Sequence, residues 1–144
     1  MEILIQRLNN NAKLPSFAHA TDAGADLYST DAMTLRPGER ALVGTGLALA
    51  IPEGYAAFVQ PRSGLAVRHG ISMVNTPGTI DAGYRGELKV ILINHDPKEP
   101  FIVEVGDRIA QLVIQKVEHP LFTEAAELPQ ADRGDNGFGS TGKG

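Results

Sequence analysis

Cysteine is absent from the 144 residues, and no apolar run approaches the length of a membrane span. Without thiols the chain can form neither disulfide bonds nor thiolate metal sites, and the redox compartment is left open. A helix needs about 20 consecutive apolar residues to cross a bilayer. Residues 1–7 also lack the charged segment and apolar stretch of a secretory signal. We therefore expect a cytoplasmic protein with no membrane partner.

Positive charge is also scarce. Lysine and arginine number 13 against 17 acidic residues, which gives a formal net charge of -4 at pH 7. The sequence has no basic stripe that could neutralise a row of phosphates, so we expect no nucleic-acid partner. An anionic substrate would have to be bound by a few local cations or with the help of a metal.

Glycine and proline are plentiful, with 16 and 9 residues. This composition favours short strands joined by turns, and the length suits one domain with a real core. The runs that read as strands are 2–8, 40–52, 55–60, 71–75, 87–93, 101–105 and 108–117. We expect the last two to pair as a hairpin. The fold class is predicted to be an all-β sandwich or barrel.

Two segments of these runs, 90–93 and 112–114, are apolar at every position. This pattern indicates strands covered on both faces, which partner subunits could provide. Gln111 lies directly before the second segment. A buried amide is costly unless it is paired, so Gln111 either completes a core network or faces a ligand.

One short helix is predicted over 63–70. Ser63 can cap it, Leu65, Ala66 and Val67 supply an apolar face, and Gly70 can end it. The helix start beside Arg62 could hold a phosphate on free backbone N–H groups, or the same residues could simply cap the helix.

The stretch 78–88 carries glycines at 78, 83 and 86, with Asp81 and Tyr84 between them. It reads as a hairpin tip from which the strand 87–93 leaves. Such a tip could hold a flat ligand against its backbone while the acid handles a water. The alternative is a surface turn with a solvated Asp81 and a packing Tyr84.

Two further features stay open on the residues alone. Asp26 could attract a cation or belong to an Asx-type turn. Residues 131–144 hold many glycines and little apolar surface, so we expect this tail to be disordered when no ligand is bound.

Five stretches, in this order and over nearly the whole chain, resemble the trimeric deoxyuridine triphosphatase (dUTPase) family: 22–29, 61–66, 78–88, 106–111 and 133–142. The resemblance implies a β jelly roll of short strands with one short helix, closed into a homotrimer with a C-terminal arm. Residues 1–130 would form the catalytic jelly-roll domain, and the Gly-rich tail 131–144 would close over the active site. Each of the three sites would be built from all three subunits.

The implied reaction is hydrolysis of dUTP to dUMP and pyrophosphate with Mg²⁺ as cofactor, which keeps uracil out of DNA and supplies dUMP for thymidylate synthesis. By the same resemblance, Asp81 would orient and deprotonate the attacking water and touch the 3′-OH. Tyr84 would stack under the deoxyribose and exclude a 2′-OH. Asp26 would bind the waters around Mg²⁺.

The other implied contacts concern the base, the phosphates and the tail. The uracil would be read by the side chain of Asn75 and the backbone around Thr79, Ile80 and Lys89, and the narrow hairpin would exclude thymine. The phosphates would be held by Arg62, Ser63, Gly64 and Gln111. The tail would add Phe138 on the uracil ring and Arg133, Gly139, Ser140 and Thr141 around the phosphates.

Two alternatives remain. A dCTP deaminase of the same fold is expected to use a glutamate near the hairpin, where this chain has Asp81 and then Tyr84. A catalytically silent dUTPase-like binding module would not need an intact Asp81 and a full tail. Pyrophosphate release from dUTP separates these alternatives from the hydrolase.

Overall fold

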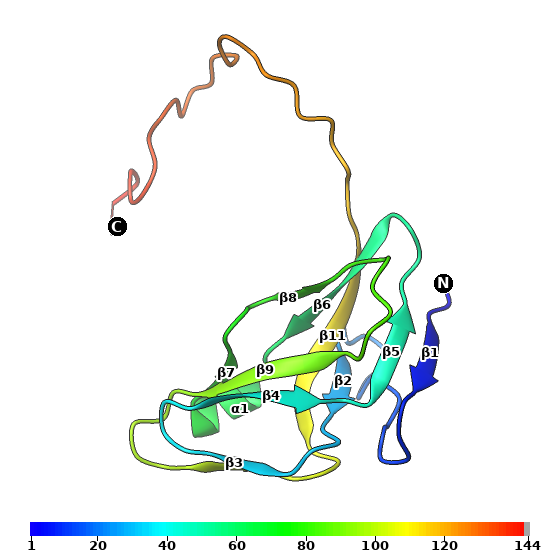
Figure 1. The fold of residues 1–144 in the computed structure, drawn as a ribbon. Coiled ribbons are helices and arrows are strands. Elements are labelled where there is room, and N and C mark those ends of the chain that lie inside the picture. Colours follow the sequence, from blue (N-terminus) through cyan, green and yellow to red (C-terminus); the bar gives the residue numbers. More distant parts are fainter. Residues whose placement is uncertain (143–144) are drawn as a thin grey trace.

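The computed structural model describes residues 1–142, so the last two residues of the predicted tail lie outside it. The described chain forms strands and one short helix (Figure 1). In order they are β1 Leu4–Arg7, β2 Ala25–Tyr28, β3 Met33–Leu35, β4 Arg40–Gly44, β5 Leu47–Ala50, β6 Tyr55–Gln60, α1 Ser63–His69, β7 Ile71–Met73, β8 Gly78–Ile80, β9 Lys89–Asn94, β10 Phe101–Val103 and β11 Arg108–Lys116. The prediction of an all-β fold with one short helix is confirmed.

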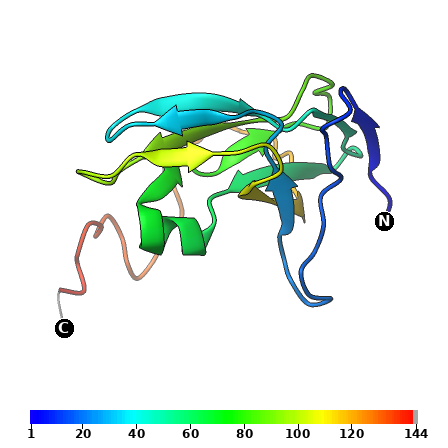
Figure 2. The ribbon, with the colours of Figure 1, turned by 90° about the horizontal axis from the view of Figure 1, so that it is seen from below.

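The strands form four antiparallel sheets. The larger two have the orders β2-β11-β6-β8 and β4-β9-β7, and the pairs β1-β5 and β3-β10 form the others. Figure 2 shows them stacked in layers, with α1 on the side away from β3 and β4. The predicted hairpin of 101–105 with 108–117 is wrong. Strand β10 pairs with β3, and β11 pairs with β2 and β6, because the apolar faces find partners far away in the sequence.

The core lies between the sheets, and strands such as β2 and β5 bury consecutive residues, whereas β9 buries alternate ones. Val90 and Leu92 of β9 are buried, whereas Ile91 and Ile93 stay partly exposed. On β11, Leu112 is buried and the next residue, Val113, which points to the opposite face, is partly exposed. Within one chain the outer faces of segments 90–93 and 112–114 are therefore only partly covered, and they still carry apolar side chains.

The N-cap of helix α1 lies one residue before the predicted one, at Arg62 instead of Ser63. Arg62 occupies the N-cap position with extended φ and ψ of -90° and 127°, and no side chain caps the helix. Ser63 is the first helical residue, so its predicted capping role is wrong. Gly70 ends the helix as predicted, because its φ of 66° is left-handed and its N–H donates to the Ala66 carbonyl. Of the predicted apolar face, Val67 is 84% exposed.

The chain leaves the sheets after β11. Every described residue from Glu118 onward is exposed, and Figure 1 shows this segment rising from the end of β11 and arching away from the body. Among the residues that the structure describes, no helix is long and apolar enough to span a membrane.

Candidate active site

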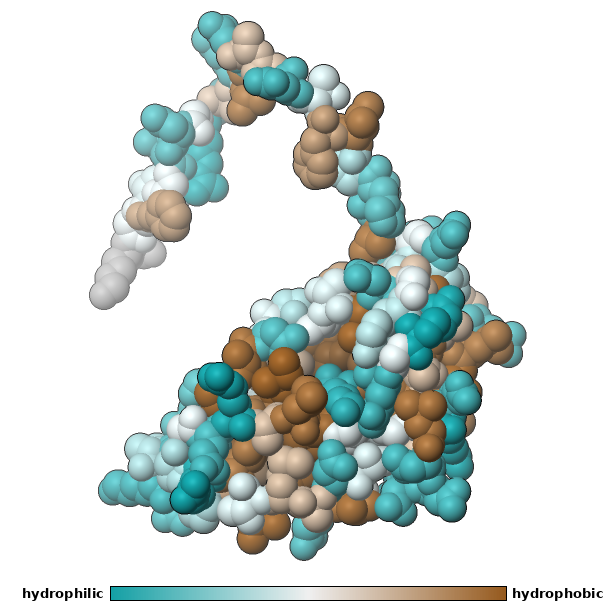
Figure 3. All heavy atoms as spheres, viewed as in Figure 1, coloured by the Kyte–Doolittle hydropathy of each residue, from teal (hydrophilic) through white to brown (hydrophobic). Residues whose placement is uncertain are grey.

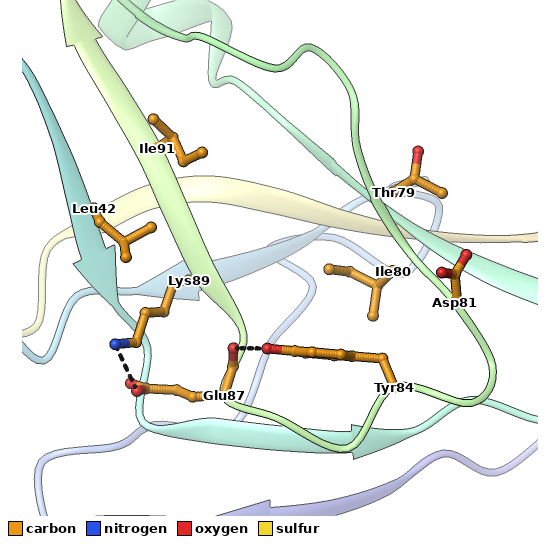
Figure 4. A pocket seen from close by; sticks show the side chains of 8 residues that line it. All are labelled: Leu42, Thr79, Ile80, Asp81, Tyr84, Glu87, Lys89 and Ile91. Carbon is orange, nitrogen blue, oxygen red and sulfur yellow. Dashed lines mark hydrogen bonds and ion pairs between the residues drawn. The ribbon is translucent and has the colours of Figure 1, made fainter.

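A pocket of about 390 Å³ opens between β8 and β9, which the loop 81–88 connects. The two strands belong to different sheets, because β8 pairs with β6 and β9 pairs with β4 and β7. The predicted hairpin is therefore not a hydrogen-bonded hairpin. Its two arms are spread apart, and the space between them is the pocket. Its lining consists of Leu42, Thr79, Ile80, Asp81, Tyr84, Glu87, Lys89 and Ile91 (Figure 4).

The ring of Tyr84 crosses from one arm of the loop to the other (Figure 4). Its hydroxyl donates a hydrogen bond of 3.0 Å to the backbone carbonyl of Glu87, and its own N–H donates to the Asp81 carbonyl. Tyr84 is 46% exposed, so a ligand can reach it. Asp81 is exposed at the rim, where a carboxylate can reach water and substrate together.

The corner between β4 and β5 holds the returning arm of the loop in place. Thr45 Oγ1 donates to the Leu88 carbonyl at 2.6 Å, and the Leu88 N–H donates to the Leu47 carbonyl at 2.7 Å. The Gly46 N–H donates to the Glu87 carboxylate at 3.0 Å, and the second carboxylate oxygen lies 3.4 Å from Lys89 Nζ. The pocket is thus built on a buried hydrogen-bond network rather than on a free surface turn.

The pocket also offers free strand edges. In the described part of the chain, β8 hydrogen-bonds to β6 alone, so its opposite edge faces the pocket. Unpaired backbone N–H and C=O groups on a strand edge can recognise a flat ligand that carries matching donors and acceptors. Thr79 and Ile80 lie on this edge.

A second cluster forms around Asp26 on the other side of the same sheet. Asp26 is 4% exposed, and its carboxylate lies 3.5 Å from Arg62 Nε and 3.4 Å from Arg108 Nη1. Arg62 also donates to the Arg108 carbonyl at 3.1 Å. Gln111 stands opposite Asp26 in the β2–β11 ladder. Two guanidinium groups around one carboxylate leave a positive excess, which suits an anionic group of a ligand.

The Oδ1 atom of Asp26 is buried and has no hydrogen-bond partner among the described residues. A buried acceptor without a partner is costly, so it is suited to accept a hydrogen bond from a ligand or a metal-bound water. In the described chain, no three His, Cys, Asp or Glu side chains are grouped to hold a metal. Mg²⁺ commonly keeps waters and takes substrate phosphates as ligands. A carboxylate such as Asp26 can contact such a metal through its bound waters, and the role that the resemblance implies for Asp26 toward Mg²⁺ stays a prediction.

The two clusters lie far apart within one chain. Asp26 is on β2 and Asp81 follows β8, and these strands are the opposite edges of a four-stranded sheet. Three strand spacings amount to about 14 Å. Across the sheet, Asp26 stands opposite Gln111, and Gln111 stands opposite Gln60. Because Val59 pairs with Gly78, Gln60 stands opposite the residue before Gly78, which is four positions before Asp81. Asp81 is therefore also displaced by about 13 Å along the strand direction.

The other predicted residues are distributed around these clusters. Ser63 and Gly64 open α1 beside Arg62. Asn75 is exposed in the bend before β8 and is not among the residues that line the pocket. Its side-chain amide lies close to Gly78, where an added Cβ would be 3.3 Å from Asn75 Nδ2. The predicted tail residues are all exposed on the departing arm, in contact with neither cluster: Arg133, Phe138, Gly139, Ser140 and Thr141.

Four residues at these clusters were missed from the sequence. Glu87 and Arg108 fall inside the stretches that carry the resemblance, but only the fold reveals their partners, Gly46 and Asp26. Leu42 and Ile91 pair across β4 and β9 and line the apolar side of the pocket. No local signal distinguishes them from ordinary strand residues.

Comparison with known proteins agrees with this arrangement. The family model described as dUTPase matches residues 10–142. The deoxyuridine 5′-triphosphate nucleotidohydrolase of Thermobifida fusca is 58% identical over 142 residues, covering 99% of this chain and 79% of its own. The protein of the same name from Corynebacterium glutamicum is 57% identical, covering 98% and 95%.

Solved structures agree as well. A variant dUTPase of Staphylococcus bacteriophage 80alpha with dUpNHpp superposes with a TM-score of 0.91 at 31% identity, covering 98% of each chain. A variant dUTPase from phage phi11 of S. aureus, whose description names a structural Mg(II) ion, gives 0.83 at 28% identity and covers 90% of this chain and 100% of its own. The chain belongs to the dUTPase family.

Proposed function

We propose that the chain hydrolyses dUTP to dUMP and pyrophosphate. The observation that carries this proposal is the pocket between β8 and β9, which combines a carboxylate, an aromatic ring and a free strand edge. The names of the curated relatives and the dUpNHpp in the phage dUTPase structure support the choice of substrate. The Asp26 cluster supplies the positive charge that a triphosphate needs in a chain of net charge -4.

In the proposed mechanism, Asp81 accepts the proton of a water whose oxygen attacks the α-phosphorus. The bond from the α-phosphorus to the bridging oxygen breaks, and pyrophosphate leaves. The exposed position of Asp81 at the rim supports this role, because the carboxylate can contact a water without first breaking an internal ion pair. Phosphoryl transfer asks mainly for positioning and electrostatic stabilisation from a protein.

Tyr84 and the strand edges provide selectivity in this proposal. The ring of Tyr84 supports the deoxyribose and leaves no room for a 2′-OH. The backbone of Thr79 and Ile80 on β8 and of Lys89 on β9 reads the edge of the uracil, with Asn75 at the entrance. Backbone groups at fixed positions exclude a methyl group on the base by its bulk.

The phosphate contacts come from the second cluster. Arg62, Gln111 and the start of α1 at Ser63 and Gly64 hold the triphosphate. Oδ1 of Asp26, which is ion-paired with Arg62 Nε at 3.5 Å but has no hydrogen-bond partner, would accept hydrogen bonds from the waters of a bound Mg²⁺. When bound, Mg²⁺ would neutralise negative charge on the phosphate oxygens. The buried position of Asp26 between two arginines keeps its carboxylate fixed for this purpose.

The separation of the two clusters supports a site shared between copies of the chain. Asp81 is offset by about 14 Å across the sheet and about 13 Å along the strands from Asp26, whose carboxylate lies 3.5 Å from Arg62 Nε. A water held by Asp81 therefore cannot attack a phosphate that is bound at the Asp26 cluster of the same copy. The half-covered strands β9 and β11 offer apolar surface for such contacts, and Figure 3 shows apolar side chains gathered over β9 and beside β8. We propose a homotrimer, in which Asp81 of one copy meets Arg62 of another.

The exposed arm completes the site. We propose that residues 1–130 form the catalytic domain and that the tail 131–144 closes over the substrate. Arg133, Ser140 and Thr141 would then contact the phosphates through side chains and Gly139 through its N–H, and Phe138 would cover the uracil. Closure expels water, which strengthens the charge interactions inside the site.

The direct test is pyrophosphate release from dUTP, with and without Mg²⁺, measured beside dCTP. We expect release from dUTP that depends on Mg²⁺ and neither release nor ammonia from dCTP. Ammonia from dCTP would identify a deaminase. Tight binding of dUTP without turnover would identify a silent binding module, and either result would overturn the proposal.

A further inference from the structure

The ring of Tyr84 lies against the backbone of Gly86. A Cβ added to Gly86 would lie 2.6 Å from Cζ and 3.0 Å from Cε2 of that ring, and closer still to its hydroxyl oxygen. Real Cβ atoms essentially never approach another heavy atom closer than 3.0 Å. The ring can therefore occupy its position only because residue 86 has no side chain.

Backbone conformation does not explain this glycine. Gly86 is not among the residues with positive φ, so its backbone is open to alanine. Tyr84 is 46% exposed and can swing toward solvent, so a methyl group at 86 would displace the ring rather than strain the core. Gly83, in the same loop, also lacks a positive φ and has nothing within 4 Å of an added Cβ. It is a matched control.

The other end of the ring is held by Glu87. The backbone carbonyl of Glu87 accepts the Tyr84 hydroxyl, and the carboxylate of the same residue accepts the Gly46 N–H at 3.0 Å. The next residue, Leu88, is buried and bonded to Thr45 and Leu47. The acceptor for the Tyr84 hydroxyl is thus tied to the buried corner between β4 and β5.

We propose that Gly86 and Glu87 are positioning residues that set where the Tyr84 ring stands, and through it the selection against ribonucleotides. This inference rests on the proposed function for its substrate. A misplacement of about 1 Å in an active site can cost about 100-fold in rate, and a 2′-OH differs from a 2′-H by an extension of that order. Gly86 fixes the ring by leaving space, and Glu87 fixes it by anchoring the hydrogen bond.

The first test needs no activity. The chain has three tyrosines, so protein labelled with 3-fluorotyrosine should give three ¹⁹F NMR signals, and Tyr84→Phe assigns one of them. Gly86→Ala should move the Tyr84 signal and leave the other two in place, while Gly83→Ala should move none. An unmoved Tyr84 signal in folded Gly86→Ala would overturn the inference.

The second test measures kcat/KM for dUTP and for UTP. Gly86→Ala should lower the dUTP/UTP ratio by about 10-fold or more, whereas Gly83→Ala should change it by less than about 2-fold. In a Tyr84→Ala background, Gly86→Ala should leave the ratio unchanged, because residues that act through one another are not additive. An equal drop in both backgrounds would show that Gly86 does not act through Tyr84.

Glu87 gives an independent variant pair. Glu87→Ala removes the acceptor of the Gly46 N–H and should lower the dUTP/UTP ratio, while Glu87→Gln keeps an oxygen there and should restore most of it. Equal dUTP/UTP ratios in Glu87→Ala and Glu87→Gln would show that the Glu87 carboxylate does not position Tyr84. If the unmodified chain releases no pyrophosphate, the proposed function fails, and the NMR comparison still decides whether Gly86 sets the ring.

Discussion

Tyr84 and Glu87 are joined by a hydrogen bond from the phenolic hydroxyl to the backbone carbonyl, 3.0 Å long, which closes the loop between β8 and β9 across its opening. The bond holds the aromatic ring as a wall of the pocket. Because Glu87 is itself bonded to Gly46, the wall is connected to the core of the domain.

Removal of this wall should relax sugar selection. Tyr84→Ala is expected to raise kcat/KM for UTP relative to dUTP, because in the proposed site the bulk of the ring excludes a 2′-OH. Tyr84→Phe keeps the ring and loses the bond to Glu87, so its ratio should lie between those of the unmodified chain and Tyr84→Ala. Steady-state kinetics with both nucleotides give the ratio. An unchanged dUTP/UTP ratio in Tyr84→Ala would locate discrimination elsewhere.

Asp81→Asn should keep the fold and the binding of a dUTP analogue and lose turnover. The amide has the size of the carboxylate but cannot accept the proton of the attacking water. The loss in kcat should be about 100-fold or more, in line with general-base contributions. Glu53→Gln makes the same chemical change at an exposed turn and should leave kcat unaltered. Near-native turnover in Asp81→Asn would remove this residue from the mechanism.

A chain cut after Gln130 should fold and assemble normally, since β11 ends at Lys116 and all the strands are retained. Its kcat/KM for dUTP should fall by about 100-fold or more, because the loss of one preorganised donor alone can cost that much. Size-exclusion chromatography and a hydrolysis assay on the same sample measure both properties. Full activity would rule out a closing tail, and loss of the oligomer would give the tail a structural role.

Local patterns predicted the elements better than their partners. The strand at 55–60 was predicted at its observed bounds, since its apolar residues lie between clear turn signals. The pairing of 101–105 with 108–117 failed because a sequence pattern gives a strand its apolar face but does not say which distant strand covers it. The observed partner of β10 is β3, more than sixty residues earlier.

In the candidate site, too, local residues could be predicted from the sequence and their distant partners could not. Asp81 and Tyr84 stand together in one short, glycine-rich stretch, which on the residues alone was compatible with a surface turn, and the family resemblance singled them out. The partners that hold the site come from far away: Arg108 lies 82 residues from Asp26, and Glu87 lies 41 residues from Gly46. The contact between Tyr84 and Gly86 was hidden for another reason, since the sequence does not give the direction in which the ring turns.

The central claim is that each active site combines Asp81 of one copy with Arg62 of another, and mixing two inactive variants tests it most directly. Asp81→Asn and Arg62→Ala, carrying different affinity tags, are unfolded together, refolded at equal concentration and purified through both tags, and pyrophosphate release from dUTP is measured. In a trimer that contains both variants, one of the three sites regains an intact Asp81 and an intact Arg62, so about one third of the unmodified activity should return after purification through both tags. Mixed oligomers no more active than the average of the two parent variants would contradict the shared site.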